Sequence, residues 1–274
     1  MELEFTKMHG LGNDFVLFNG LEQDIELSPE QVRVIADRHF GIGCDQVLLL
    51  QPSQEADVRY RIFNADGAEV EQCGNGARCI ADFLHKHGYT SGDVITAQTI
   101  NGNIQIYIDG DDMIRVNMGV PRFQPEDIPL RAEMRRSNYA VELSCGTVSL
   151  MALSMGNPHA ILVVDNVDEA PVASLGQEIQ AHEIFPLGVN VGFMQILDPA
   201  HIRLRVYERG AGETLACGSG ACAAVVAGHF NNKLETQVDV GLKGGHLNVS
   251  WPGEGESVWM TGPATTVYKG QIEL

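Results

Sequence analysis

Alternating apolar and polar residues mark several short segments of the chain as β-strands. Between Asp57 and Phe63, for example, Val58, Tyr60 and Ile62 alternate with two arginines. A period of two residues places one set of side chains on each face of a strand. The same interpretation applies to residues 103–108, 113–118, 201–207 and 237–251, and Gly-bearing turns lie at Asn101-Gly102, Asp109-Gly110 and Lys243-Gly244-Gly245. The pattern therefore predicts a sheet-rich protein with many antiparallel neighbours.

Three segments have the features of helices. Ser28-Pro29-Glu30-Gln31 is a capping box with proline at the first helical position, and it predicts a helix that runs to about His39. Residues 76–87 and 220–231 each begin inside a Gly-rich loop and predict two further helices. Helices are thus fewer than strands, and the fold class is α+β. No Gly-x-Gly-x-x-Gly fingerprint follows a predicted strand, so nothing points to a nucleotide.

One segment of the chain occurs twice at a fixed offset. The stretch from Arg61 to Ala77 aligns without gaps with the stretch from Arg205 to Ala221, 144 residues later, and six of the 17 positions are identical. Unrelated segments of average composition would share about one. The same offset relates Gly12-Asn13 to Gly156-Asn157, Gln46 to Asn190 and Asn64 to Glu208. The Gln46/Asn190 match alone is compatible with coincidence, but the whole set favours two copies of one fold facing each other.

Composition and charge exclude several classes of function. The 274 residues carry 18 basic and 36 acidic side chains, a net charge of −18, so nucleic acid and anionic membrane surfaces are improbable partners. No apolar run approaches the ~18 residues that would span a bilayer, and the first residues do not have the pattern of a signal peptide. Six cysteines are too few for a disulfide scaffold. We therefore expect a cytoplasmic protein with reduced thiols.

The repeated Cys-Gly-x-Gly loops carry the chemistry. Each loop follows a predicted strand and enters a predicted helix, so Cys73 and Cys217 are expected at helix N-termini. The unpaired N–H groups and the dipole there would lower the pKa of a thiol and hold a carboxylate. Two such loops facing each other would place one sulfur on each side of an α-carbon. That arrangement permits inversion of a stereocentre by a thiolate base and a thiol acid.

Longer motifs resemble those of the diaminopimelate epimerase family, nearly from end to end of the chain. They are Met8-His-Gly-Leu-Gly-Asn-Asp-Phe15, Phe63-Asn-Ala-Asp-Gly67, Cys73-Gly-Asn-Gly-Ala-Arg-Cys79, Met155-Gly-Asn-Pro-His159, Glu208-Arg-Gly-Ala-Gly-Glu-Thr214 and Ala216-Cys-Gly-Ser-Gly-Ala-Cys222. The resemblance implies two pseudo-symmetric domains of mostly antiparallel sheet, each wrapped around a central helix, with the active site in the cleft between them. Residues 1–118 with 264–274 would form the half that carries Cys73, and residues 119–263 the half that carries Cys217.

The resemblance also implies an activity and a set of site residues. The family interconverts LL- and meso-diaminopimelate for lysine and peptidoglycan precursor synthesis, without pyridoxal phosphate or metal. The implied substrate contacts are Asn13, Gln46, Asn64, Gly74, Asn75, Asn157, Asn190, Glu208, Arg209, Gly218 and Ser219. His159 and Glu208 are implied to tune the catalytic thiols of Cys73 and Cys217, and Tyr268 to lie at a homodimer interface. Arg209 suits a substrate carboxylate and Glu208 an ammonium group.

Other interpretations remain open at this point. Cys79 and Cys222 could be metal ligands, but their spacing from Cys73 and Cys217 is not that of zinc sites, so we expect them to be buried apolar residues. Cys44 and Cys145 are assigned the same role. His159 could be a histidine of the core. A proline or hydroxyproline racemase-like enzyme and a thiol-redox or metal-binding protein are the alternative functions.

Overall fold

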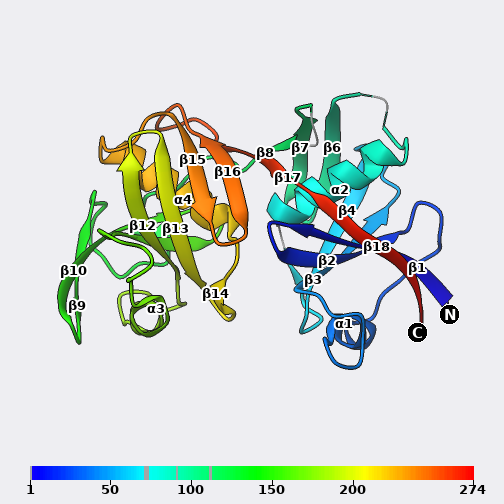
Figure 1. Cartoon of the computed structure of the whole chain (residues 1–274), viewed down its shortest axis with the longest axis horizontal. Helices are drawn as coiled ribbons and strands as arrows, with labels where there is room; N and C mark the ends of the chain where they lie inside the picture. Colours follow the sequence, from blue (N-terminus) through cyan, green and yellow to red (C-terminus); the bar gives the residue numbers. More distant parts are fainter. Residues whose placement is uncertain (1, 71–73, 91, 111–112) are drawn as a thin grey trace. The chain divides into compact units, whose positions relative to one another are not determined.

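The computed structural model describes residues 2–70, 74–90, 92–110 and 113–274 (Figure 1). Contacts within the chain divide it into two compact units, Met1–Asn117 with Thr261–Leu274, and Met118–Met260. Sheet dominates both units, as the alternating patterns predict. In the described part of the chain, no helix is long and apolar enough to cross a membrane.

The first unit is a twisted run of strands around one long helix. Its elements are β1 (Glu2–Gly10), β2 (Asn13–Asn19), α1 (Pro29–Ala36), β3 (Gln46–Gln51), β4 (Val58–Asn64), β5 (Glu69–Val70), α2 (Gly74–Lys86), β6 (Val94–Thr99), β7 (Gly102–Ile108), β8 (Met113–Asn117) and β18 (Thr265–Glu273). The C-terminal strand β18 pairs antiparallel with β1, and Figure 1 shows the red strand running along the dark blue one. Pairing then continues through β2, β3, β4, β6, β7 and β8, with β2/β3 and β4/β6 parallel.

The second unit has the same succession of elements. They are β9 (Tyr139–Leu143), β10 (Gly146–Ser154), β11 (Pro158–Val163), α3 (Val172–Gln180), β12 (Asn190–Asp198), β13 (His201–Glu208), β14 (Gly212–Thr214), α4 (Gly218–Phe230), β15 (Gln237–Leu242), β16 (Gly245–Ser250) and β17 (Trp259–Pro263), preceded by the short helix η1 (Pro125–Asp127). β11/β12 and β13/β15 are parallel, as their counterparts are in the first unit, while β12/β13 is antiparallel. The chain passes back into the first unit within β17.

Strand registers confirm the internal repeat. Phe15 pairs with Gln46 in the first unit, and His159 pairs with Asn190 in the second, each exactly 144 residues later. Val47 and Phe63 pair as their counterparts Val191 and Tyr207 do. The register differs by one residue only at the first hairpin, where the loop before β11 is longer, and between β13 and β15. The offset that was found in the motifs is therefore a property of the whole fold.

A buried helix lies at the centre of each unit. In α4 every residue from Gly220 to Ala227 is buried, and most are alanine or valine, so the helix is apolar all round. A Cβ at Gly76 in α2 would lie 2.4 Å from the Tyr60 hydroxyl, and one at Gly220 would lie 3.1 Å from Val206. Glycine at these two related positions lets the first helical turn approach the sheet.

Three details differ from the sequence-based expectations. The helix α1 ends at Ala36 rather than near His39, because the carboxylate of Asp37 accepts the backbone N–H groups of His39 and Phe40 and turns the chain away. Helix α3 was not predicted; Pro171 caps it without a side-chain hydrogen bond, so the usual start signal is missing. Cys145 is exposed in the β9–β10 turn, so its assignment to the core was wrong, whereas Cys44, Cys79 and Cys222 are buried.

Candidate active site

Cys217 occupies the N-cap of α4. Its backbone is extended, with φ −122° and ψ 108°, and its sulfur accepts the N–H of Gly220 at 3.4 Å. The Ser219 hydroxyl lies 3.7 Å from the same sulfur. Only 4% of Cys217 is exposed. The predicted position of this thiol at a helix N-terminus is confirmed, and its counterpart in the repeat, Cys73, lies outside the described residues.

The expected lowering of the thiol pKa is not found at Cys217. Burial, followed by the negative charge of Glu208, raises the pKa of the Cys217 thiol well above its ordinary value. The hydrogen bonds from Ser219 and Gly220 act in the opposite direction but do not outweigh burial. In this arrangement Cys217 is therefore a protonated thiol at neutral pH, which can act as an acid.

A chain of hydrogen bonds leads from His159 to this sulfur. His159 is fully buried on β11, and its Nε2 lies 2.9 Å from Asn157 Oδ1. Asn157 Nδ2 donates to Ser219 Oγ at 3.3 Å, and that hydroxyl faces Cys217. Burial, followed by the positive charge of Arg209, lowers the pKa of His159 to about 3. His159 is therefore neutral, and because Asn157 Oδ1 is an acceptor, the proton of the imidazole is on Nε2.

Three further predicted residues meet at the end of β13. Asn190, which is buried, donates to the carbonyl of Pro158 at 3.1 Å and accepts the backbone N–H of Arg209 at 2.9 Å. Glu208 accepts the Thr214 hydroxyl at 2.5 Å. The side chain of Arg209 is exposed, and its Nη1 donates to the carbonyl of Leu187 at 3.0 Å. A carboxylate and a guanidinium thus follow each other in sequence beside the buried thiol.

The first unit brings together two pairs of predicted residues. Gln46 Nε2 donates to Asn64 Oδ1 at 2.8 Å, across β3 and β4. Asn75, in the first turn of α2 after Gly74, donates from Nδ2 to Asn13 Oδ1 at 3.1 Å. The other oxygen contact of Asn75 is open: its buried Oδ1 has no hydrogen-bond partner within the described ranges. This atom is an acceptor at the start of the helix that follows Cys73 in sequence.

Comparison with known proteins decides the family. The family model for diaminopimelate epimerase matches residues 5–124 and 151–267. The chain belongs to the diaminopimelate epimerase family. Proteins named diaminopimelate epimerase from Nitrosospira multiformis and Alkalilimnicola ehrlichii are 54% and 55% identical to it. The first alignment covers 100% of this chain and 99% of the relative, and the second covers 100% of both.

Solved structures that resemble the chain confirm the fold of this epimerase family. A phenazine biosynthesis protein of the PhzF family from Bacillus anthracis superposes with a TM-score of 0.74 at 16% identity, over 100% of both chains. A probable proline racemase from Agrobacterium radiobacter, with bound carbonate, has a TM-score of 0.71 at 19% identity, over 99% of this chain and 93% of the other. At this low identity the likeness concerns the fold alone. As members of an epimerase family are isomerases, so is this chain.

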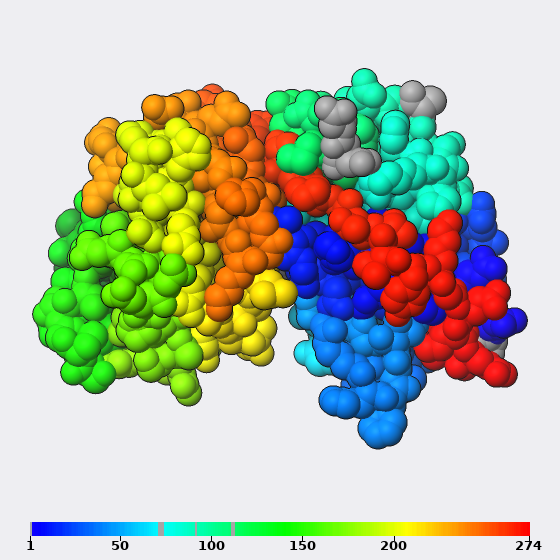
Figure 2. Space-filling model, in the orientation of Figure 1, coloured from blue at the N-terminus to red at the C-terminus, as the bar shows by residue number. Residues whose placement is uncertain are grey.

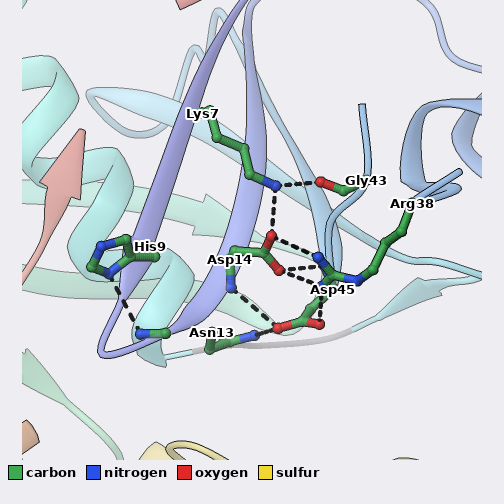
Figure 3. A network of polar contacts seen from close by, with 8 residues as sticks. Lys7, His9, Asn13, Asp14, Arg38, Gly43 and Asp45 are labelled. Carbon is green, nitrogen blue, oxygen red and sulfur yellow. Dashed lines mark hydrogen bonds and ion pairs between the residues drawn. The ribbon is translucent and has the colours of Figure 1, made fainter. Parts of the chain in front are cut away.

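A charged network that the motifs did not reveal lies beside Asn13 in this member of the epimerase family (Figure 3). Asp14 binds Lys7 at 2.6 Å and Arg38 at 2.7 Å, and Arg38 also binds Asp45 at 2.7 Å. Burial alone would raise the pKa of Asp14, but the hydrogen bonds and charges of Arg38 and Lys7 outweigh it and bring the pKa to about 2. The signal in the sequence was weak, because the four residues are scattered over 39 positions.

Two remaining expectations concern metal and assembly. No cluster of three or more His, Cys, Asp or Glu side chains with the geometry of a metal site occurs among residues that the structure describes. Tyr268, predicted at a homodimer interface, is 46% exposed on β18, and its ring packs edge-on against Phe5 with centroids 5.9 Å apart. It takes no part in the groups around Cys217 or Asn13.

The raised pKa of Cys217 predicts slow alkylation. In the free enzyme we expect iodoacetamide to modify Cys217 much more slowly than the exposed Cys145 at pH 7 to 9. The rate at Cys217 should still be rising with pH above the ordinary range of thiols, because only the thiolate reacts. Peptide mapping by mass spectrometry after timed quenching measures both rates in one sample. Rapid modification of Cys217 at pH 7 would show that it rests as a thiolate.

Proposed function

We propose that this chain interconverts LL- and meso-diaminopimelate by a two-base mechanism at paired cysteines. The main support is the position of Cys217 at the N-cap of α4 in a chain whose full length aligns with diaminopimelate epimerases at 54–55% identity. The repeat makes Cys73 the counterpart of Cys217, because α2 begins 144 residues before α4. In bacteria that make this compound, the product serves lysine and peptidoglycan precursor synthesis.

The two thiols would divide the proton transfer between them. With its raised pKa, Cys217 holds a proton and is the acid for one direction of the reaction, while Cys73 as thiolate removes the α-proton from the opposite face. The roles exchange in the reverse direction. No pyridoxal phosphate or metal takes part in these steps, since both proton transfers are assigned to side chains of this chain.

The start of α4 supplies the electrostatic stabilisation. The first N–H groups of a helix have no partner within the helix, and those of Gly218 and Ser219 follow directly after Cys217. A carboxylate bound there would accept negative charge from the developing carbanion at the neighbouring α-carbon. We propose the corresponding role for Gly74 and Asn75 at the start of α2.

The remaining polar residues would recognise the second amino-acid end of the substrate, which is not inverted. Arg209 presents an exposed guanidinium that can bind a carboxylate through two hydrogen bonds, and Glu208 can bind the ammonium group. The amides of Asn157, Asn190 and Asn64 fix the orientation of that end, and Gln46 in turn holds Asn64. A zwitterion of fixed handedness satisfies these donors and acceptors, whereas its mirror image cannot satisfy all of them.

We further propose that the compact units correspond to the two epimerase halves, residues 1–118 with 264–274 and residues 119–263. The first half carries Cys73 and the second carries Cys217. The matching registers of the two units support this division. A reaction that cycles between free thiol and thiolate also needs a reducing compartment, which supports a cytoplasmic location.

We propose a homodimer that buries Tyr268. All residues from Thr265 to Lys269 on β18 are exposed, and Figure 2 shows this red segment on the surface beside the blue N-terminal strand. Val267 is 54% exposed next to Tyr268. Light scattering during size-exclusion chromatography should find a dimer for the natural sequence and a larger monomer fraction for Tyr268→Ala. Leu197→Ala, an exposed apolar site of the second unit, is the matched control. A monomeric natural protein would contradict the dimer.

One assay tests the activity. Protein treated with a chelator and with hydroxylamine, which destroys pyridoxal phosphate imines, is incubated with LL-diaminopimelate under reducing conditions, and the isomers are separated by chiral chromatography. We expect formation of the meso isomer up to an equilibrium mixture. Absence of conversion would refute the proposal. Racemisation of proline without conversion of diaminopimelate would assign the chain to the racemases, and disulfide exchange alone would assign it to thiol-redox proteins.

A further inference from the structure

Two related asparagines contact the first turns of the central helices. Asn13 begins β2 and Asn157 directly precedes β11, 144 residues apart. Asn13 is hydrogen-bonded to Asn75 in α2, and Asn157 to Ser219 in α4, and these two helix residues are also 144 positions apart. The repeat has therefore preserved the position of an amide beside each helix start, although its helix partner is an asparagine in one half and a serine in the other.

The two amides are held in opposite orientations. Asn157 turns its Oδ1 to the N–H of His159 and its Nδ2 to Ser219. Asn13 turns its Nδ2 to Asp45 Oδ2, at 2.8 Å, and its Oδ1 to Asn75 Nδ2. An ionised carboxylate only accepts hydrogen bonds, so the NH2 group of Asn13 must face Asp45. A neutral imidazole with its proton on Nε2 donates, so the oxygen of Asn157 must face His159.

Asp45 is itself fixed from several sides, as Figure 3 shows. Its Oδ2 accepts the backbone N–H of Asp14 at 3.1 Å, while its own N–H donates to the Asp14 carboxylate at 3.0 Å. Its Oδ1 binds Arg38 at 2.7 Å, and Arg38 also binds Asp14. Lys7 completes the frame through Asp14 and the carbonyl of Gly43. These contacts join the starts of β2 and β3, just where Asn13 and Gln46 lie.

Resting on the proposed epimerase function, we propose that Asp45 is a positioning residue that sets the amide orientation of Asn13. The consequence is a difference in chemistry between the two helix starts. Asn157 donates to Ser219, so the hydroxyl proton of Ser219 points to the sulfur of Cys217. Asn13 accepts from Asn75, so the buried Oδ1 of Asn75 stays available as an acceptor. The group in the substrate that such an acceptor fits is the ammonium.

The location of the pair makes the inference testable without unfolding the protein. The side chains of Arg38 and Asp45 are about half exposed, at 54% and 45%. Ion pairs in such positions contribute little to stability. Removal of the Asp45 carboxylate should therefore change the orientation of Asn13 far more than it changes the fold.

The test is a double-mutant cycle on steady-state kinetics with LL-diaminopimelate. We expect Asp45→Ala to raise KM about tenfold, with a smaller change in kcat, as the loss of one oriented hydrogen bond predicts. Asn13→Ala should have a similar effect, and Asp45→Ala combined with Asn13→Ala should be no worse than Asn13→Ala alone. Asp168→Ala, which removes a similar Asp–Arg pair with Arg203, is the control and should match the natural protein. Kinetics within twofold of the natural sequence for Asp45→Ala, or multiplicative effects in the double variant, would overturn the proposal.

A second measurement does not depend on the reaction. In protein labelled with 15N-asparagine, the side-chain NH2 signal of Asn13 is the one that Asn13→Ala removes. We expect this signal to shift and to exchange faster with solvent in Asp45→Ala, and not in Asp168→Ala. An unchanged signal in Asp45→Ala would refute the positioning role. If the natural protein did not convert diaminopimelate, the proposed function would fail while the NMR result still decided whether Asp45 orients Asn13.

Discussion

Cys217→Ala and Cys73→Ala are each expected to abolish epimerisation, with kcat falling by at least about 10²- to 10⁴-fold, the usual contribution of a positioned acid or base. Both substitutions remove a group that must give or take a proton in every turnover. At Cys217 the geometry adds a reason, because no other acid can easily replace a buried sulfur that accepts Gly220 N–H and faces Ser219. Rates should be measured in both directions, from LL- and from meso-diaminopimelate.

Two controls separate this result from a loss of folding. Cys145→Ala removes an exposed thiol far from α4 and should leave kcat and KM unchanged. Thermal unfolding of Cys217→Ala should differ little from that of the natural protein, because alanine suits the apolar surroundings of the N-terminus of α4. Near-normal turnover in either single variant would refute the assignment of two catalytic thiols.

The second large effect is expected at His159, where two substitutions should behave differently. His159→Leu leaves the Oδ1 of Asn157 without its donor, which costs about 1–3 kcal/mol for a buried acceptor, or about 5- to 150-fold in kcat/KM if the orientation of Asn157 serves the transition state. His159→Gln can place an amide N–H near the position of Nε2 and should recover most of the activity. Recovery by glutamine identifies His159 as a neutral donor that acts through Asn157 and Ser219.

The pH dependence gives an independent check on His159. Its pKa in the folded protein is lowered to about 3, against about 6.5 for a free histidine, so the unfolded chain binds the extra proton first. Its contribution to stability is therefore complete above pH 6.5 and is lost as the pH falls from 6.5 toward 3. His159→Gln should reduce this acid destabilisation. A rate profile with an acid limb near pH 6.5 that disappears in His159→Gln would instead show that His159 titrates during catalysis.

Much of the fold could be predicted because the repeat is visible in the sequence itself. The identical Cys-Gly-x-Gly-Ala segments predicted that two strands, two turns and two helices are equivalent, and the registers of Gln46 and Asn190 follow from that equivalence. Helix α3 could not be found in this way, since it has no counterpart with a capping signal. The end of α1 depends on a side-chain contact of Asp37 that competes with the next helical turn.

The chemistry of the site was only partly accessible from the sequence. The N-cap position of Cys217 was predictable, because a helix start is a local property. The direction of its pKa was not, since burial and the approach of Glu208 arise from tertiary packing and outweigh the local N–H groups. The frame around Asn13 was also missed, because Lys7, Arg38 and Asp45 come from three separate segments that only folding brings together.

The most direct test of the two-base mechanism is the fate of solvent deuterium at early times. LL-diaminopimelate is incubated with the protein in heavy water, and the isomers are separated and analysed by mass spectrometry before a tenth of the substrate has reacted. Because the acid that protonates the opposite face exchanges with solvent, the meso product should carry one deuterium at the inverted carbon. The unreacted LL-diaminopimelate should carry almost none. Deuterium that accumulates in recovered substrate as fast as in product, or a meso product without deuterium, would contradict the mechanism.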